Sequence, residues 1–169
     1  PSTDAYFARA NLYSQLGRQE LALGDIRKAF ELAPTTPNAL AEADALANLG
    51  RFDESLQLID TYDDDAENRL AVLQEKAQVL GMAGKAKEGL AVLDELLTER
   101  PGDPEILNTM CWHMGVWQLD EDKMLPECTK AVETAGWSPP VLDSRAMAYF
   151  RLGRLDDALA DYNAALSGA

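Results

Sequence analysis

The chain has 169 residues, of which 47% are apolar and 26% charged, and this composition is typical of a globular protein, not of a disordered one. No apolar run approaches the ~20 residues that a membrane-spanning helix needs, so we expect no membrane insertion. The 29 acidic residues outnumber the 15 basic ones and give a formal charge of −14, which would repel the phosphates of nucleic acid. A basic partner is compatible with this charge, although acidic faces that keep the protein soluble are the simpler interpretation.

Apolar residues recur with helical spacing along the whole chain and predict ten helices. We expect these helices at 3–16, 19–32, 37–49, 53–62, 66–82, 86–99, 104–116, 121–135, 139–152 and 155–166. Pro104, Pro139 and Pro140 lie in predicted first turns, which accept proline. The period-two alternation of strands is absent, so the chain is predicted to be all-α.

Glycines recur at intervals of about 34 residues, at Gly17, Gly50, Gly84 and Gly153. The last interval is about twice as long as the others, so it contains an additional unit without the glycine, whose turn is expected near Gln118 or Leu119. Glycine suits such a turn because it tolerates a positive φ. The sequence therefore predicts five units, each a pair of helices joined at this turn.

Small and large apolar residues hold fixed positions relative to the turn. A small residue precedes it by seven positions in every unit, at Ala10, Ala43, Ala77, Cys111 and Ala146. A large apolar residue precedes it by four positions, at Tyr13, Leu46, Leu80, Met114 and Tyr149. A matching pattern follows the turn, as Ala22, Ile26 and Ala29 in the first unit and Ala158, Tyr162 and Ala165 in the last. These spacings place small side chains where two helices can approach closely.

In these residues the chain resembles the tetratricopeptide repeat (TPR) family over essentially its whole length. Residues 142–166, LDSRAMAYFRLGRLDDALADYNAAL, are very close to the family pattern. The second repeat is degenerate, and the fourth departs most, because it lacks the turn glycine and carries Pro126 in its second helix. The resemblance implies an all-α, right-handed α-solenoid of five helix-turn-helix repeats, a single array over 1–169 with repeats at about 3–36, 37–69, 70–103, 104–138 and 139–169. It further implies a non-catalytic scaffold that binds a protein or peptide and needs no cofactor.

The resemblance also implies a binding surface, a concave face lined by the first helix of each repeat. Carried over position by position, this face contains Phe7, Asn11, Leu40, Asp44, Gln74, Gln78, Asn108, Trp112, Asp143 and Met147. We expect it to hold an extended peptide through its backbone by the Asn and Gln amides, with Phe7, Trp112 and Met147 taking apolar side chains. The alternative is that these positions are only solvated or partly packed.

Some TPR domains bind the C-terminal carboxylate of a peptide with Lys and Asn side chains. Asn11 fits that pattern, but Ala41, Ala71 and Glu75 stand where Asn, Lys and Arg would help, so a carboxylate ligand is not expected. Trp112 is the strongest binding candidate, because tryptophan is frequent at binding hot spots. Trp117 and Trp137 are expected to pack near loops.

Cys111 and Cys128 are the only cysteines. Their repeat positions lie on facing helices of the fourth repeat, so both a disulfide and two small buried thiols remain open. A disulfide would indicate a periplasmic or secreted protein, and free thiols a cytoplasmic one. His113 lies too near Cys111 along one helix to face it, so no catalytic pair is expected. Zinc needs about four ligands, and two cysteines with one histidine fall short, so no metal is expected.

Residues 107–112 (LNTMCW), together with Glu127 and Cys128, resemble a TPR variety of bacterial proteins, in some of which the repeats follow a transglutaminase-like or protease domain. This weaker resemblance implies a bacterial envelope protein. Because the chain begins at Pro1 without Met, we expect a segment of a longer protein. The repeats would then be a scaffold for a partner, or a regulatory or structural appendage that docks onto an enzyme domain of the same parent chain. The last repeat has no polar cap, so its apolar side, with Leu166, is expected to meet the parent, a partner or a second copy.

Overall fold

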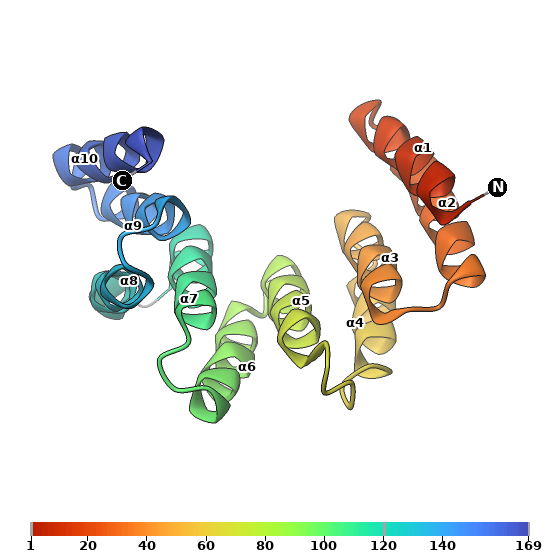
Figure 1. The fold of residues 1–169 in the computed structure, drawn as a ribbon, viewed down its shortest axis with the longest axis horizontal. Helices are drawn as coiled ribbons and strands as arrows, with labels where there is room; N and C mark the ends of the chain where they lie inside the picture. Colours follow the sequence, from red (N-terminus) through yellow and green to blue (C-terminus); the bar gives the residue numbers. More distant parts are fainter. Residues whose placement is uncertain (1, 120, 169) are drawn as a thin grey trace. The chain divides into compact units, whose positions relative to one another are not determined.

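The computed structural model describes residues 2–119 and 121–168, and in these ranges it contains ten α-helices and no strand (Figure 1). The helices are α1 (Thr3–Gln15), α2 (Gln19–Leu32), α3 (Thr36–Asn48), α4 (Phe52–Asp60), α5 (Arg69–Met82), α6 (Ala86–Glu99), α7 (Pro104–Trp117), α8 (Glu121–Ala135), α9 (Pro139–Arg151) and α10 (Leu155–Ser167). Each lies where the sequence predicts a helix, with ends that agree to within a few residues. The predicted all-α class of helical-repeat solenoids is confirmed.

The helices form two compact units, unit 1 over Pro1–Lys85 and unit 2 over Ala86–Ala169. Unit 1 therefore contains α1 to α5 and unit 2 contains α6 to α10. The division falls between the two helices of the expected third repeat, and each unit is described below by itself. That one array extends over 1–169 stays a prediction.

Unit 1 is a succession of helix hairpins that pack through small residues. Each helix lies against its neighbour in the chain, and α3 also lies against α5. Ala10 and Ala43, the small residues that precede the turn, are almost fully buried. In the second repeat the hydroxyl of Ser55 on α4 donates a hydrogen bond of 2.8 Å to the carbonyl of Ala43 on α3. The small residues on both sides of the turn thus bring the two helices into close contact, as their spacing predicts.

Helix α5 begins three residues later than predicted, because a hydrogen-bonded loop precedes it. The Asp65 carboxylate accepts bonds from the backbone N–H of Asn68 at 3.2 Å and from its side-chain amide at 2.9 Å. The hydroxyl of Thr36, at the start of α3, donates to the same carboxylate. These bonds hold the residues before Arg69 in turns, and the bond from Thr36 is long-range, so local periodicity does not reveal it.

In unit 2, α7 lies against α6, α8 and α9, while α8 and α10 both pack on α9. One buried cluster joins α7, α8 and α9 and contains Cys111, Met114, Met124, Cys128 and Ala148. A second cluster joins α8 and α9 through Val132, Val141 and Leu142. Helices α7 and α9 therefore contact each other and both contact α8, with α6 on α7 and α10 on α9.

The turn between α7 and α8 keeps the backbone conformation of the other turns although it lacks their glycine. Gly17 and Gly153 have φ values of 70° and 74°, and Gln118, which takes the corresponding place, has a φ of 54°. A left-handed conformation costs a residue with a Cβ roughly 1–2 kcal/mol. Pro126 lies inside α8 without ending it.

Candidate functional site

The ten residues predicted to line the binding face all lie on first helices of the repeats, and none is fully buried. Asn11, Trp112 and Asp143 are exposed, and the partly buried ones are Phe7, Leu40, Asp44, Gln74, Gln78, Asn108 and Met147. In unit 1, the packing of α3 against α5 brings the residues of these two helices to one surface. Among the described helices α1 packs only on α2, so Phe7 and Asn11 are not brought together with them.

The α3–α5 surface of unit 1 carries a pair of acids, Asp44 and Glu75. Burial raises the pKa of Glu75, and the charge of Asp44 raises it further, to about 7. One carboxylate oxygen of Glu75, Oε1, is buried without a hydrogen-bond partner among the described residues. Burial also raises the pKa of Asp44, against a hydrogen bond of 3.0 Å that the Asn48 amide donates to it. Burial therefore favours the protonated form of both acids, and Glu75, with a pKa of about 7, is partly protonated at neutral pH.

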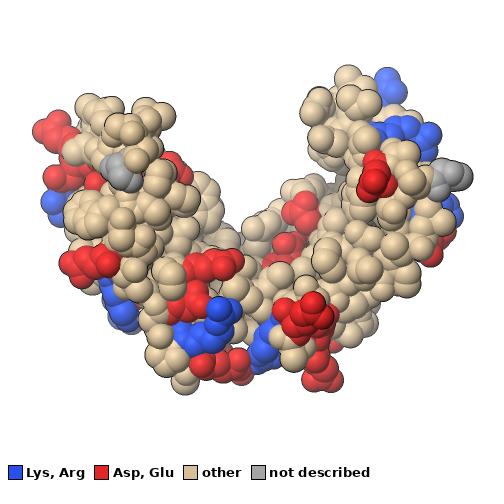
Figure 2. All heavy atoms as spheres, viewed as in Figure 1, with Lys and Arg blue, Asp and Glu red and all other residues tan. Residues whose placement is uncertain are grey.

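Sequence reasoning recognised Glu75 only as a residue standing where a basic one was expected. The pair was missed because it depends on the distance between α3 and α5, which the repeat spacing alone does not give. Figure 2 shows acidic side chains on both units, interspersed with basic ones and with broad areas that carry neither. No continuous basic area is seen on this face, in agreement with the formal charge of −14.

The α7–α9 surface of unit 2 has a different character, because an aromatic residue stands in a row with an amide and a thioether. Asn108, Trp112 and Gly115 follow one another on α7 at helical spacing. Trp112 is 38% exposed, and Asn108 Oδ1 is buried without a hydrogen-bond partner among the described residues. The row therefore exposes an apolar ring, whereas the Asn108 oxygen one turn away is covered by the protein.

Gly115 lets Met147 of α9 lie directly against α7. A Cβ at Gly115 would be only 3.1 Å from Met147 Cγ, closer than carbon atoms normally pack. Met147 is thereby held against α7 one turn after Trp112, and Phe150, which lies on the same face of α9 by helical spacing, is 53% exposed. Sequence reasoning missed both Gly115 and Phe150; a glycine inside a helix was the signal for the first, since glycine is otherwise unfavourable there.

The other two tryptophans make contacts within unit 2. The Trp117 ring stacks on the His113 ring with centroids 4.2 Å apart. The guanidinium of Arg145 lies 4.9 Å from the centroid of the Trp137 ring, which leaves Trp137 half exposed. Among the described residues Trp112 makes no such ring contact, and its 38% exposed ring can meet a ligand.

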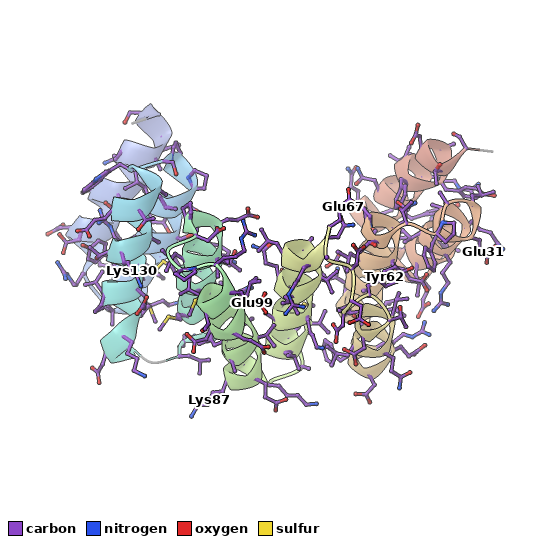
Figure 3. The ribbon with its side chains drawn as sticks, turned by 60° about the horizontal axis from the view of Figure 1, so that its bottom comes forward. Glu31, Tyr62, Glu67, Lys87, Glu99 and Lys130 are labelled. Carbon is purple, nitrogen blue, oxygen red and sulfur yellow. A yellow bond between two sulfur atoms is a disulfide. The ribbon has the colours of Figure 1, made fainter. Side chains whose placement is uncertain are left out.

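Cys111 and Cys128 are fully buried, and their sulfur atoms lie 2.08 Å apart, at disulfide distance, between α7 and α8 (Figure 3). A cysteine in a disulfide is not a nucleophile. The neighbouring His113 is only 6% exposed, burial lowers its pKa to about 4, and its Nδ1 has no hydrogen-bond partner among the described residues. The imidazole is therefore neutral at physiological pH and packs against Trp117.

Within the described residues, no helix is both long enough and apolar enough to cross a bilayer. Over the same residues, His, Cys, Asp and Glu side chains form no group of three that could hold a metal ion.

Two models of the tetratricopeptide repeat match the sequence, one over residues 3–36 and 140–167 and the other over residues 39–61. None of the curated proteins matches the sequence.

Solved structures of TPR proteins are similar to the chain over almost its full length. TTC0263, a thermophilic TPR protein of Thermus thermophilus, is 20% identical with a TM-score of 0.73, covering 99% of this chain and 92% of its own. MamA 41-end from Desulfovibrio magneticus RS-1 is 17% identical with a TM-score of 0.58, covering 98% and 93%. YrrB, described as a TPR protein with an unusual peptide-binding site, is 17% identical with a TM-score of 0.55, covering 96% and 84%.

At these identities the likeness to solved structures shows the fold alone. The sequence models add the repeat itself, and they match in the first, second and last of the helix hairpins described above. TPR proteins are in general scaffolds for protein interaction and not catalysts. The chain belongs to the tetratricopeptide repeat family.

Proposed function

We propose that the chain is a non-catalytic scaffold that binds a protein or an extended peptide along the first helices of its repeats. The observation that carries the proposal is the row on α7 and α9, where the Trp112 ring is 38% exposed and Met147 of α9 packs on α7 at Gly115, one helical turn after Trp112. An extended peptide would place an apolar side chain on Trp112, and it would donate a backbone N–H to the Asn108 oxygen only after a local rearrangement uncovers that oxygen. YrrB, a protein of the same fold with a peptide-binding site, supports this use of the fold.

The acids of unit 1 favour an internal peptide segment over a C-terminal carboxylate. Asp44 and Glu75 lie on the surface where a carboxylate-binding TPR domain would need Lys or Arg. A negatively charged chain end would be repelled there, whereas an uncharged backbone or a basic side chain would not. A protein or peptide of neutral or basic character is therefore the ligand that fits both surfaces.

The experiment is a binding measurement with peptides selected against the immobilised chain from a random library. Trp112→Ala is expected to weaken binding at least about tenfold, as the loss of an aromatic hot spot does. Leu159→Ala, which removes a more exposed apolar side chain (59% against 38% for Trp112) from α10, is the control and should leave the affinity unchanged. Amidation of the peptide's C-terminus should also have no effect. Equal affinities of the Trp112 variant and the unchanged chain would remove the α7–α9 surface as the site.

The environment proposed for this scaffold is an oxidising one, in a larger bacterial protein of the periplasm or the cell exterior. The cysteine pair at disulfide distance supports it, because cytosolic thiols are kept reduced. Mass measurement of the chain from cells, with and without a reductant, tests the compartment through the state of Cys111 and Cys128. A chain recovered with two free thiols would favour the cytoplasm.

A second candidate function, an appendage that docks onto an enzyme domain of the same parent chain, has a specific observation in its favour. Leu155, Leu159 and Leu166 on α10 are 60%, 59% and 86% exposed. Such a surface fits a covering protein domain or a second copy of the chain. Sedimentation of the chain and of its Leu159→Glu variant distinguishes a second copy from a domain of the parent chain. A dimer that the substitution abolishes would indicate self-association. If both proteins are monomers, docking onto the parent chain is the remaining explanation.

A further inference from the structure

The position eight residues before the turn carries a charged side chain in four of the five repeats, and each makes an ion pair between helices. In the first repeat Arg9 Nε lies 2.6 Å and Arg9 Nη2 lies 2.7 Å from the Asp25 carboxylate oxygens. In the last repeat Arg145 makes the same two bonds to Asp161, at 2.7 and 2.8 Å. In both cases the pair ties the first helix of a repeat to its own second helix.

In the second and third repeats, the charged residue at this position forms its ion pair with the preceding repeat. Glu42 on α3 accepts a bond of 2.8 Å from Arg27 on α2, and Lys76 on α5 lies 2.8 Å from Asp60 on α4. Here the first helix is tied to the second helix of the preceding repeat. A charge at this position therefore fixes the first helix in four repeats, whichever neighbour it uses.

The fourth repeat lacks this interhelical ion pair. It also lacks the turn glycine, and it has a proline inside its second helix. Met110 occupies the position and cannot form an ion pair. Gln118 adopts the left-handed turn conformation that glycine adopts without cost elsewhere. Pro126, inside α8, can supply no backbone N–H to the helix. The next residue after Met110 is Cys111, and its bond to Cys128 is the one covalent tie between α7 and α8.

We propose that the Cys111–Cys128 bond makes the hairpin of α7 and α8 conditional on redox state. A dithiol reductant would break the S–S bond by transferring two electrons and two protons, giving two cysteine thiols and the oxidised, disulfide form of the reductant. The reduced hairpin then lacks the turn glycine, the ion pair and the covalent tie together, and it opens more readily than the hairpins of unit 1. Unit 1 contains no cysteine and is unaffected.

The burial of both cysteines determines how fast a reductant can break the disulfide. Both cysteines are fully buried, in contact with Met114, Met124 and Ala148, so a reductant reaches the bond only when the hairpin opens. The folded, oxidised chain is therefore reduced slowly, and the redox state is mainly decided where the chain folds. Since Asn108 and Trp112 lie on α7, opening the hairpin would also disturb the α7–α9 surface, and this part of the inference rests on the proposed function.

Hydrogen exchange followed by mass spectrometry tests the inference without any ligand. After reduction with dithiothreitol, backbone amides of α7 and α8 are expected to exchange at least about tenfold faster, while those of α1 to α4 keep their rates. The melting temperature of unit 2 should fall by roughly 10 °C, as expected for loss of a disulfide that closes a loop of this length. Unchanged exchange in α7 and α8 on reduction, or equal loosening of both units, would overturn the proposal.

A variant without the two cysteines distinguishes the effect of the disulfide bond from the effect of the side chains at these two positions. Cys111→Ala with Cys128→Ile installs the residues that the first repeat holds at the same positions, Ala10 and Ile26. Its exchange should not respond to dithiothreitol, and any response would contradict the proposal. Gln118→Gly in the reduced chain should restore part of the protection of α7 and α8. Peptide binding is measured separately: redox-dependent exchange without binding would refute the proposed function and leave this inference standing.

Discussion

Each unit contains a mostly buried titratable side chain with an atom that has no hydrogen-bond partner among the described residues, and the two groups respond to pH in opposite directions. In unit 1, burial and the charge of Asp44 raise the pKa of Glu75 to about 7. In unit 2, burial lowers the pKa of His113 to about 4. Burial favours the uncharged form in both cases, which means a protonated carboxyl but a deprotonated imidazole. Within one repeat architecture, burial of a single group thus gives the two units contributions to stability that change with pH in opposite directions.

The ion pairs of the first and last repeats sharpen the comparison, and here we expect the largest effect. The side chain of Arg145 is only 8% exposed and lies beside the Trp137 ring, whereas Arg9 is 57% exposed. Arg145→Ala would leave the buried carboxylate of Asp161 unpaired and should cost about 3 kcal/mol of unfolding free energy in unit 2. Arg9→Ala, the matched change in unit 1, also leaves a buried carboxylate, since the Asp25 side chain is only 8% exposed, but it should cost less because water reaches and screens this pair from the exposed side of Arg9.

Unfolding in urea, followed unit by unit through hydrogen exchange, measures both variants. Equal losses of unfolding free energy in the two units would mean that the burial of Arg145 does not strengthen its ion pair with Asp161.

A second prediction concerns Glu75. Its pKa is higher in the folded chain, about 7, than the usual value of 4.5, so the folded state binds more protons between these two pH values. Stability of unit 1 should therefore fall as the pH rises from 4.5 through 7. Glu75→Gln removes this charge and should stabilise unit 1 by about 1–3 kcal/mol at pH 8, with no such gain below pH 4.5. Denaturant titrations at the two pH values measure the difference, and a gain independent of pH would contradict the assignment.

A third prediction concerns His113, with the opposite sign. Its folded pKa of about 4 is below the usual 6.5, so the unfolded state binds more protons between these values. Stability of unit 2 should fall by about 2 kcal/mol as the pH drops from 6.5 to 5, and fall further towards 4. His113→Gln should lower stability at pH 7 but remove most of this pH dependence. A variant that keeps the full dependence would assign it to another group.

Sequence periodicity was sufficient for the helices and for the cysteine positions, because both depend on local spacing. Cys111 and Cys128 occupy repeat positions that face each other in every hairpin, so their proximity follows from the repeat. The pairing of Glu75 with Asp44 could not be predicted in the same way, because it depends on how closely α5 approaches α3. The late start of α5 likewise depends on a hydrogen bond from Thr36 to Asp65 across two helices.

The candidate binding face, too, could be predicted from the repeat spacing only in part. The repeat positions identify which residues lie on first helices, and the structure finds all ten there. They do not tell which of these residues form one surface. The contact of Met147 with Gly115 joins α7 to α9, and it requires a glycine that the repeat pattern does not specify. Side-chain size at a helix crossing, and not periodicity, decides this part of the site.

The smallest expected effect concerns the turn of the fourth repeat and separates the two units once more. Gln118 has a φ of 54°, and Gly84, at the corresponding turn of the third repeat, has a φ of 78°. Gln118→Gly should stabilise the oxidised chain by about 1 kcal/mol, because glycine adopts this conformation without the clash of a Cβ, although part of the gain is offset by its greater freedom in the unfolded chain. Gly84→Ala is the matched control and should destabilise by a similar amount, since no neighbouring atom lies within 4 Å and the backbone conformation alone opposes the methyl group. A Gln118→Gly variant no more stable than the unchanged chain in a urea titration would mean that the turn of the fourth repeat is not strained, and the weakness of this hairpin would then rest on Met110 and Pro126.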